Sequence, residues 1–517
     1  MKPIKRPVLI AILTFIHTLL YGSILIATNL SQQHLSTTDF ALSFSLDFIF
    51  YFAYAWALFF SLRFLGKHTF LVLVPLLFIA SAIASYYVYV YKIDISNDTL
   101  GLALEVEPTL ILQFITVRLL LWLALALTIA IALARLCIRH ELTDPRDKMV
   151  LLVSGMFVFT AFFMDGGISR QYLPYNYLLA TKDFLWTSTK GAPAKIDISQ
   201  QPATLAKTTP ENMVVVMVVG ESVRPDHWQL GTYKRNTNPI LSKRSNLTFY
   251  DDVPSCGPFT RDALPCLLSR ASYLEPENYN KETSFISLFR KLGFYTAWVD
   301  MQGSTASVFD SSITSLIHEA NQSIAFNTNL FTSPQYDEAL LPVMDTILKE
   351  HKGRVLLVLH QFGSHWPYDS RYPAAFHTFT PTCSKSTAIV GDFKTTEDMK
   401  ACDHQQLINA YDNSILYLDF ILDQIIHRIE NRPAMMLYTS DHGESLGEDG
   451  YYMHGHSDAH GNGITVERRV PVVFWHSDSY PLTVDKDRIT HDSVFHSILD
   501  CAGISSSVIN KELSICN

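Results

Sequence analysis

The chain has 517 residues, of which 48% are apolar types and only 17% are charged. Its 32 Phe and 24 Tyr exclude a disordered chain, because disorder requires low hydrophobicity. The net charge of −9 argues against nucleic-acid binding, since nucleic-acid-binding proteins present a basic surface to phosphates. The length is sufficient for more than one domain.

Five apolar segments in the first third of the chain predict an α-helical, five-span membrane domain over residues 1–168. Four of them exceed the ~18 residues needed to cross a ~30 Å hydrocarbon layer, and the last is shorter. Lys2, Lys5 and Arg6 precede the first segment, whereas the loop at 30–40 has no Lys or Arg. The positive-inside rule therefore places the N-terminus in the cytoplasm and everything beyond the fifth span outside. The predicted spans are 8–29, 41–65, 69–91, 113–137 and 149–165.

Residues 169–210 are predicted to connect this membrane domain to the rest of the chain. The segment contains several aromatic residues and few charges, and Tyr and Trp favour the lipid headgroup layer. Two interpretations stay open, an interfacial helix and a packed linker. The aromatic residues are Tyr172, Tyr175, Tyr177, Phe184 and Trp186.

The remainder, residues 211–517, is predicted to be an external α/β domain. Short, continuous apolar runs are typical of strands buried on both faces, as in a parallel sheet. Helical patterns at 283–292 and 405–428 lie between such runs and suggest βαβ units. The predicted strands are 213–219, 294–299, 354–359, 434–438 and 470–475.

Six of the seven cysteines fall in this external part, and an even number in an oxidising compartment suggests disulfides. Six cysteines allow 15 connectivities. We predict pairing between nearest neighbours, with a mixture of free buried thiols as the alternative. The predicted pairs are Cys256 with Cys266, Cys383 with Cys402, and Cys501 with Cys516.

Carboxylate and imidazole groups follow three of the predicted strands. Glu221 follows the run at 213–219, Asp441 and His442 follow 434–438, and His360 and His365 follow 354–359. Ligands of open α/β sheets bind beyond the carboxyl ends of the strands, so these groups should converge. Oxygen and nitrogen donors of this kind suit Zn²⁺ or a similar divalent ion.

Thr260 is the candidate nucleophile of this site. It follows the Gly257-Pro258 turn and stands where a helix could begin. A helix N-terminus can receive an anionic phosphate, and a metal-bound hydroxyl is deprotonated more easily than a free one. A simple helix-capping role is the alternative. His456 and His460, in a loop rich in Gly and Asp, are expected to be solvated.

Taken together, these motifs resemble those of the phosphoethanolamine transferases, inner-membrane enzymes with a sulfatase-like domain of the alkaline phosphatase superfamily. The resemblance extends over the whole chain, including the five spans, and is most specific at 440–454. The motifs are Gly220-Glu221-Ser222, the run 231–239, the Cys-flanked Thr260, Gly363-Ser364-His365, the run 440–448 and His454-Gly455.

The resemblance implies that Glu221, Thr260, Asp441 and His442 coordinate a catalytic zinc and that Thr260 is the nucleophile. His365 and His454 would lie near the phosphoryl group, where they could stabilise charge, shuttle protons or hold a second zinc. The disulfide around Thr260 is also a family-like feature. After the Trp298 strand, where relatives have an Asn-rich segment, this chain differs, and Asp300, Gln302 and Ser304 are the candidates for substrate binding there.

The implied reaction transfers phosphoethanolamine from phosphatidylethanolamine to an envelope acceptor such as lipopolysaccharide, through a phospho-threonine-type intermediate. The implied location is the bacterial inner membrane, with the catalytic domain in the periplasm. One alternative is a glycerol-phosphate transferase or polymerase of the lipoteichoic acid synthase type, which also has five spans. Another is a non-catalytic membrane protein with a degenerate hydrolase domain, which should have lost ligands that this sequence retains.

Overall fold

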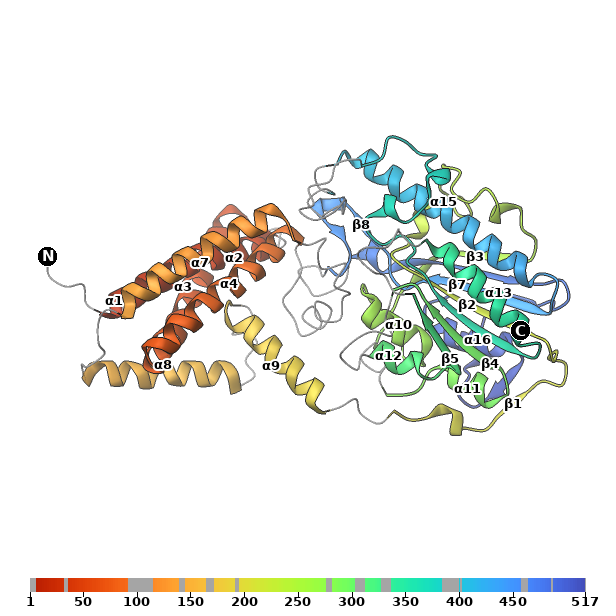
Figure 1. The fold of residues 1–517 in the computed structure, drawn as a ribbon, viewed down its shortest axis with the longest axis horizontal. Helices are drawn as coiled ribbons and strands as arrows, with labels where there is room; N and C mark the ends of the chain where they lie inside the picture. The colour runs from red at the N-terminus through yellow and green to blue at the C-terminus, as the bar shows by residue number, and fades with distance from the viewer. Residues whose placement is uncertain are drawn as a thin grey trace.

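The computed structural model consists of a helical bundle and an α/β domain joined by one helix, α9 (Tyr175–Lys190) (Figure 1). The structure describes residues 6–31, 36–91, 115–138, 145–163, 172–190, 195–275, 281–302, 312–326, 336–383, 399, 402–456, 464–484 and 487–516. The loop between the third and fourth predicted spans lies outside these residues. The exact domain boundaries at 168 and 210 stay a prediction.

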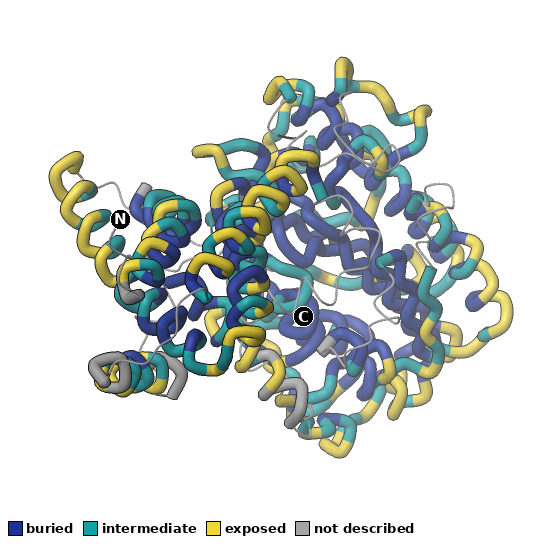
Figure 2. The backbone as a smooth tube through the Cα atoms, turned by 60° about the vertical axis from the view of Figure 1, so that its left-hand side comes forward, coloured by how far each residue is buried: buried dark blue, intermediate teal, exposed yellow. Residues whose placement is uncertain are grey.

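Within the described residues, four helical segments of the bundle are long and apolar enough to cross a membrane. The first runs over Val8–Leu30 and combines α1 (Arg6–His17), a π-helical turn at Thr18–Gly22 and α2 (Ser23–Ser31). The others are α3 (Thr37–Phe64), α4 (Lys67–Tyr91) and α7 (Val117–Ile138). Large apolar side chains are exposed along these helices, including Ile49, Val72 and Leu121. Exposed positions recur along the helices of the bundle (Figure 2). An exposed apolar surface of this kind is typical of contact with lipid.

The fifth predicted span corresponds to α8 (Pro145–Phe163), which packs against α3. Its apolar part within the described residues covers Met149–Thr160. At 1.5 Å per residue this part is roughly 18 Å long, short of the ~30 Å hydrocarbon layer. Four of the five predicted spans are therefore confirmed by length and composition, and the fifth stays a prediction.

The segment that connects the two parts docks on the bundle through tyrosine hydroxyls. The hydroxyl of Tyr172 donates to Asp47 Oδ1 at 3.2 Å, and that of Tyr175 donates to the Tyr54 carbonyl at 3.2 Å. Two residues further, the Tyr177 hydroxyl donates to the carbonyl of Leu77 at 3.1 Å. The segment contains a helix, and the start of α9 is packed against α3 and α4; a position in the membrane interface stays a prediction.

The α/β domain is built on a central sheet whose strand order, among the described residues, is β3-β10-β7-β2-β6-β4-β5. The strands β2, β4, β6 and β7 are parallel, as the continuous apolar runs predicted, and β5, which the sequence did not predict, is parallel to β4. The prediction was wrong for β10, which runs antiparallel to both β7 and β3. A strand buried on both faces has the same continuous apolar pattern in either direction, so the pattern does not determine the direction. The strand bounds are β2 Val214–Gly220, β3 Leu247–Pro254, β4 Tyr295–Asp300, β5 Gln322–Ala325, β6 Val355–His360, β7 Ala434–Ser440 and β10 Arg469–His476.

Helices cover both faces of this sheet and make two separate apolar cores. Alternate residues of β2 belong to opposite cores: Val216 and Val218 face one, and Val215 and Met217 face the other. The first core is closed by α13 (Leu340–Glu350) and α15 (His404–Ile429). The second is closed by α10 (Thr260–Leu268), α11 (Phe285–Lys291), α12 (Ser312–Ile317) and α16 (Asp492–Cys501). Short ladders pair β1 (Ala203–Leu205) with β11 (Ile504–Ser506) and β8 (Ser445–Leu446) with β9 (Tyr452–Met453).

The three predicted disulfides are confirmed. Cys256 is bonded to Cys266, Cys383 to Cys402, and Cys501 to Cys516. All seven cysteines lie in the described residues, and the remaining one, Cys137, is a buried free thiol in α7.

This pairing predicts the outcome of a thiol titration. In denaturant without reductant, only Cys137 should react, so an alkylating reagent should modify one thiol per chain. After reduction it should modify all seven. Peptide mass spectrometry identifies the modified residues, and modification of two or more external cysteines before reduction would contradict the pairing.

Candidate metal centre and nucleophile

Three neighbouring strands bring their carboxyl ends to one point of the sheet. In the strand order β7-β2-β6, Gly220 lies opposite Ser440 and Val219 lies opposite His360. The residues that follow these strands therefore emerge side by side. The convergence predicted from the sequence is present in the structure for Glu221, Asp441 and His442, whose ligand atoms lie within 4.8 Å of one another.

Glu221 is at the centre of this cluster and is buried. Its Oε1 accepts a hydrogen bond from the Ser222 hydroxyl at 2.7 Å and lies 3.2 Å from His442 Nε2. Its Oε2 accepts hydrogen bonds from the hydroxyl of Thr260 and the side-chain amide of Gln302, both at 2.9 Å. The carboxylate therefore joins the candidate nucleophile to the candidate metal ligands.

The tautomer of His442 follows from its hydrogen bonds. Its Nδ1 lies 2.8 Å from the carbonyl oxygen of Gly443, and because a carbonyl can only accept, Nδ1 carries a proton. In the neutral ring Nε2 then holds the lone pair, and it faces Glu221 Oε1 and Asp441 Oδ2, the latter at 3.4 Å. A histidine fixed through its other ring nitrogen is typical of metal sites.

The charges of these groups are strongly coupled. Burial, together with the negative charge of Glu221, raises the pKa of Asp441 to about 6. Burial lowers the pKa of His442, but the carboxylates of Asp441 and Glu221 outweigh it and raise this pKa to about 10. Two adjacent buried carboxylates require a compensating positive charge, which a proton on His442 or a bound cation can supply. Two carboxylates and one imidazole are a donor set that fits Zn²⁺.

Thr260 is the first residue of α10, as the sequence predicted. Its hydroxyl lies 2.9 Å from Glu221 Oε2 and 3.5 Å from His442 Nε2. The Cys256–Cys266 disulfide closes a loop around this helix start. Gly455, at a φ of +92°, leaves room for Phe259, because a Cβ there would come 2.1 Å from the Phe259 ring. The disulfide and the packing of Gly455 on Phe259 together fix the position of the helix start that carries Thr260.

His365 and His454 lie beside the same cluster. The Nδ1 of His365 donates to the Trp366 carbonyl at 2.7 Å, and the Nδ1 of His454 pairs with Glu444 Oε2 at 2.7 Å. The His454 ring lies 4.0 Å from that of His442 and 5.9 Å from that of His365, between ring centroids. Both histidines form, with Glu221, a further group that could hold a metal ion, and His454 also belongs to a group with His442 and Glu444. Burial lowers the pKa of His365 and of His454.

The three residues suggested for substrate binding have different positions. The Asp300 carboxylate is buried and accepts hydrogen bonds from His360 Nδ1 at 3.0 Å and from the Gln302 backbone at 2.8 Å. The side chain of Gln302 instead contacts Glu221. Ser304 lies outside the described residues. Gln302 is therefore part of the cluster, whereas Asp300 is engaged by His360.

Sequence reasoning missed two carboxylates of the site. Glu444 is buried, accepts a hydrogen bond from Tyr368 at 2.7 Å and pairs with His454. The sequence could have indicated Glu444, because this residue follows Asp441 and His442 in the same motif. Glu467 is also buried and pairs with His456 Nδ1 at 2.6 Å. The expectation that His456 is solvated was wrong, because this pair buries it; His460 lies outside the described residues.

A glycine allows two chain segments to meet at Glu221. Gly363 has a φ of +53°, and a Cβ at this position would lie 2.7 Å from the backbone nitrogen of Glu221 and 2.8 Å from its carbonyl oxygen. The next residue, Ser364, donates its backbone N–H to the same carbonyl at 2.9 Å. A side chain at 363 would push the turn carrying His365 away from Glu221.

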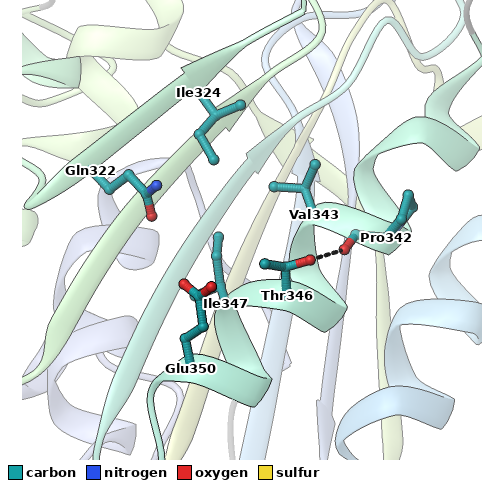
Figure 3. Close-up of a pocket in the computed structure, with 7 residues that line it drawn as sticks. All are labelled: Gln322, Ile324, Pro342, Val343, Thr346, Ile347 and Glu350. Atoms are coloured by element: carbon teal, nitrogen blue, oxygen red, sulfur yellow. Dashed lines mark hydrogen bonds between the residues drawn. The ribbon is translucent and has the colours of Figure 1, made fainter.

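The cavity shown in Figure 3 is separate from this cluster. It measures about 300 Å³ and lies between the edge strand β5 and α13, away from the ends of β7, β2 and β6. Its lining includes Gln322, Ile324 and Glu350 and shares no residue with the cluster.

Comparison with known proteins agrees with this architecture. A family model described as Sulfatase matches residues 213–504. The chain is 30% identical over 315 residues to "Phosphoethanolamine transferase EptA" of Salmonella typhimurium, which covers 57% of this chain and 54% of that protein. It is 26% identical over 465 residues to "Kdo(2)-lipid A phosphoethanolamine 7''-transferase" of the same organism, covering 82% and 78%. The chain spans about half the length of most of the curated relatives it matches.

Solved structures share the fold. The integral membrane protein EptA, a lipooligosaccharide phosphoethanolamine transferase from Neisseria meningitidis, has a TM-score of 0.79 at 23% identity and covers 98% of each chain. The periplasmic domain of EptC from Campylobacter jejuni has a TM-score of 0.52 at 29% identity, over 62% of this chain and 97% of that one. The corresponding domain of Escherichia coli EptC, solved in complex with Zn, has a TM-score of 0.52 at 22% identity, over 61% and 89%.

The fold and the cluster define a membrane-anchored α/β protein of the sulfatase type. The chain belongs to the sulfatase family, it shares its full-length fold with EptA of Neisseria meningitidis, and its relatives are named as phosphoethanolamine transferases. The predicted fold class is thereby confirmed, as is the predicted location in the inner membrane with the α/β domain in the periplasm.

The close approach at Gly363 predicts a large effect of one methyl group. Gly363→Ala should destabilise the α/β domain by about 1–2 kcal/mol for the left-handed backbone and about 1–3 kcal/mol more for the collision with Glu221. Gly293→Ala is the matched control, because Gly293 has a φ of +83° but nothing within 4 Å of its Cβ. Urea unfolding followed by circular dichroism measures both, and equal losses would show that the contact with Glu221 does not matter.

Proposed function

We propose that this chain transfers phosphoethanolamine from phosphatidylethanolamine to a cell-envelope acceptor, with lipopolysaccharide as the acceptor, by way of a covalent ester on Thr260. The observation that carries the proposal is the placement of the Thr260 hydroxyl at a helix N-terminus, 2.9 Å from Glu221 and 3.5 Å from His442 Nε2. The names of the relatives, which include transferases of phosphoethanolamine to Kdo(2)-lipid A, support the choice of substrate class.

Glu221, Thr260, Asp441 and His442 would hold a zinc ion, as the donor set fits and as a relative has been solved in complex with Zn. When bound, zinc would lower the pKa of the Thr260 hydroxyl and stabilise negative charge on the phosphoryl group. The hydrogen bond from Thr260 to Glu221 Oε2 directs the hydroxyl proton toward a carboxylate and leaves the oxygen lone pairs free.

Two displacements at phosphorus account for the reaction. In the first, the Thr260 oxygen bonds to phosphorus while the bond to the diacylglycerol oxygen breaks, and diacylglycerol leaves with a proton. In the second, an acceptor oxygen bonds to phosphorus, the bond to Thr260 breaks and the threonine regains its proton. His365 donates through Nδ1 to a carbonyl and His454 is paired through Nδ1 with Glu444, so each can present Nε2 to a proton or a metal ion in these steps.

The membrane helices fit lipid substrates. Phosphatidylethanolamine and lipopolysaccharide both reside in membranes, and the bundle would keep the α/β domain next to them. The glycerol-phosphate alternative uses the same scaffold and differs in the group left on Thr260. The degenerate, non-catalytic alternative is disfavoured because nucleophile and ligands lie together in one cluster.

Substitution of Thr260 tests the nucleophile. Thr260→Ala should abolish transfer and leave the fold and most of the metal binding, because Glu221, Asp441 and His442 remain. Thr260→Ser should keep part of the activity, since the hydroxyl survives with a less restrained χ1. Transfer is measured by mass spectrometry of lipopolysaccharide from cells with and without each variant.

The intermediate provides a control that does not depend on the acceptor. Wild-type protein incubated with phosphatidylethanolamine vesicles should carry phosphoethanolamine on the peptide containing Thr260, and chelation of metal should prevent this. A glycerol-phosphate adduct would favour the alternative transferase. An adduct on Ser222 or Ser255, or near-normal transfer by Thr260→Ala, would overturn the assignment.

Removal of the membrane half tests its role. A fragment beginning near residue 200 should fold and bind zinc but lose most of its activity toward lipid acceptors, because it no longer resides at the membrane. Activity is compared on vesicles and on a short-chain, water-soluble donor, on which the fragment should match the full chain. Full activity of the fragment on vesicles would refute a substrate role of the spans.

A further inference from the structure

His491 lies between the segment that carries Thr260 and the segment that carries Asp441 and His442. The sequence pattern did not identify this residue. It precedes α16, is 1% exposed and has both ring nitrogens engaged. Its Nδ1 lies 3.1 Å from the backbone nitrogen of Cys256, four residues before Thr260. Its Nε2 lies 3.1 Å from the backbone oxygen of Ser440, which directly precedes Asp441.

The partners fix the protonation of this ring. A backbone N–H can only donate and a backbone carbonyl can only accept, so Nδ1 must be the acceptor and Nε2 must carry the proton. Only the neutral Nε2–H tautomer satisfies both bonds. Burial is consistent with this, as it lowers the pKa of His491 to about 3.

The sheet connects these two segments only through an intervening strand. The loop with Cys256 follows β3, whereas Ser440 ends β7, and β10 lies between those strands. Ser440 is further tied to the turn after Glu221, because its hydroxyl accepts the Val223 backbone N–H at 2.9 Å. One imidazole thus bridges the loop carrying Thr260 and the strand end carrying the candidate metal ligands.

We propose that His491 is a positioning residue that sets the distance between the Thr260 hydroxyl and the Asp441-His442 ligand pair by bridging Cys256 and Ser440. The role in transfer rests on the proposed function, whereas the bridge itself does not. Loss of the ring should let the Cys256–Thr260 segment move relative to β7 and slow attack by Thr260. Metal binding should persist, because Glu221, Asp441 and His442 are untouched.

The test uses the full-length protein in detergent, with His491→Phe to remove both bonds while keeping an aromatic ring. His496→Phe is the matched control, because His496 is also buried at α16 and its Nδ1 also accepts a backbone N–H, from Asn510 at 3.1 Å. His491→Asn is the conservative variant, since its amide oxygen can replace Nδ1 as acceptor for Cys256.

Two measurements are made on each variant. Hydrogen exchange of the peptide containing Cys256 should be roughly fivefold faster in His491→Phe, as expected for loss of one hydrogen bond, and unchanged in His496→Phe. The rate at which saturating phosphatidylethanolamine vesicles modify Thr260 should fall at least about tenfold in His491→Phe, with zinc content and the donor concentration for half-maximal rate unchanged. His491→Asn should restore the exchange protection and part of the rate.

Each outcome decides the inference. Unchanged exchange at Cys256, or a modification rate equal to that of wild type, in His491→Phe would overturn it. An equal loss of rate in His496→Phe would show a merely structural role and overturn it as well. If wild-type protein is not modified at Thr260 at all, the proposed function fails, and the exchange at Cys256 still decides whether His491 forms the bridge.

Discussion

The interaction on which the site depends is the burial of several carboxylates at one edge of the sheet. Glu221, Asp441 and Glu444 are each removed from water and lie within a few side chains of one another. Burying several negative charges close together costs free energy unless positive groups and hydrogen-bond donors surround them. The pKa values of Asp441 and of His442 are raised because both groups lie among buried negative charge. The histidines, the hydroxyl of Thr260 and the amide of Gln302 are the groups that offset the cost of this charge.

The scaffold meets this demand through parallel strands and close backbone packing. Because β7, β2 and β6 are adjacent and parallel, their ends deliver Asp441, Glu221 and the turn to His365 to one side. Gly363 lets that turn lie against Glu221, and the disulfide and Gly455 fix the start of α10. Helices on both faces bury the sheet, so the strand ends have little freedom to separate.

Much of this arrangement was predictable from local sequence patterns. Apolar runs located the five predicted strands, the polar residues behind them located Glu221, Asp441 and His442, and a Gly-Pro turn located the start of α10 at Thr260. The direction of β10 was not predictable, because burial on both faces gives one pattern for either direction. The same holds for Glu467 with His456, 11 residues apart, and for His491 with Cys256, 235 residues apart, because neither pair is marked by a regular spacing and both meet only through the fold. The predicted strand 294–299 correctly put Asp300 at the end of β4. The hydrogen bond between its carboxylate and His360 depends on the neighbouring strand β6, which the sequence pattern does not reveal.

A covalent ester on Thr260 suits a protein that joins a compact site to a membrane bundle. Donor and acceptor in the proposed reaction are both large amphiphiles, and a direct transfer would require both headgroups and both sets of acyl chains at one cluster. A threonine ester separates the two encounters, so that diacylglycerol leaves before the acceptor arrives and the same helix start and ligand set serve each displacement in turn. The rigid placement of the hydroxyl is then the property the fold must protect, because an error of about 1 Å in the position of an attacking group can cost roughly a hundredfold in rate. The disulfide, the packing of Gly455 on Phe259 and the bridge through His491 all act on that one position.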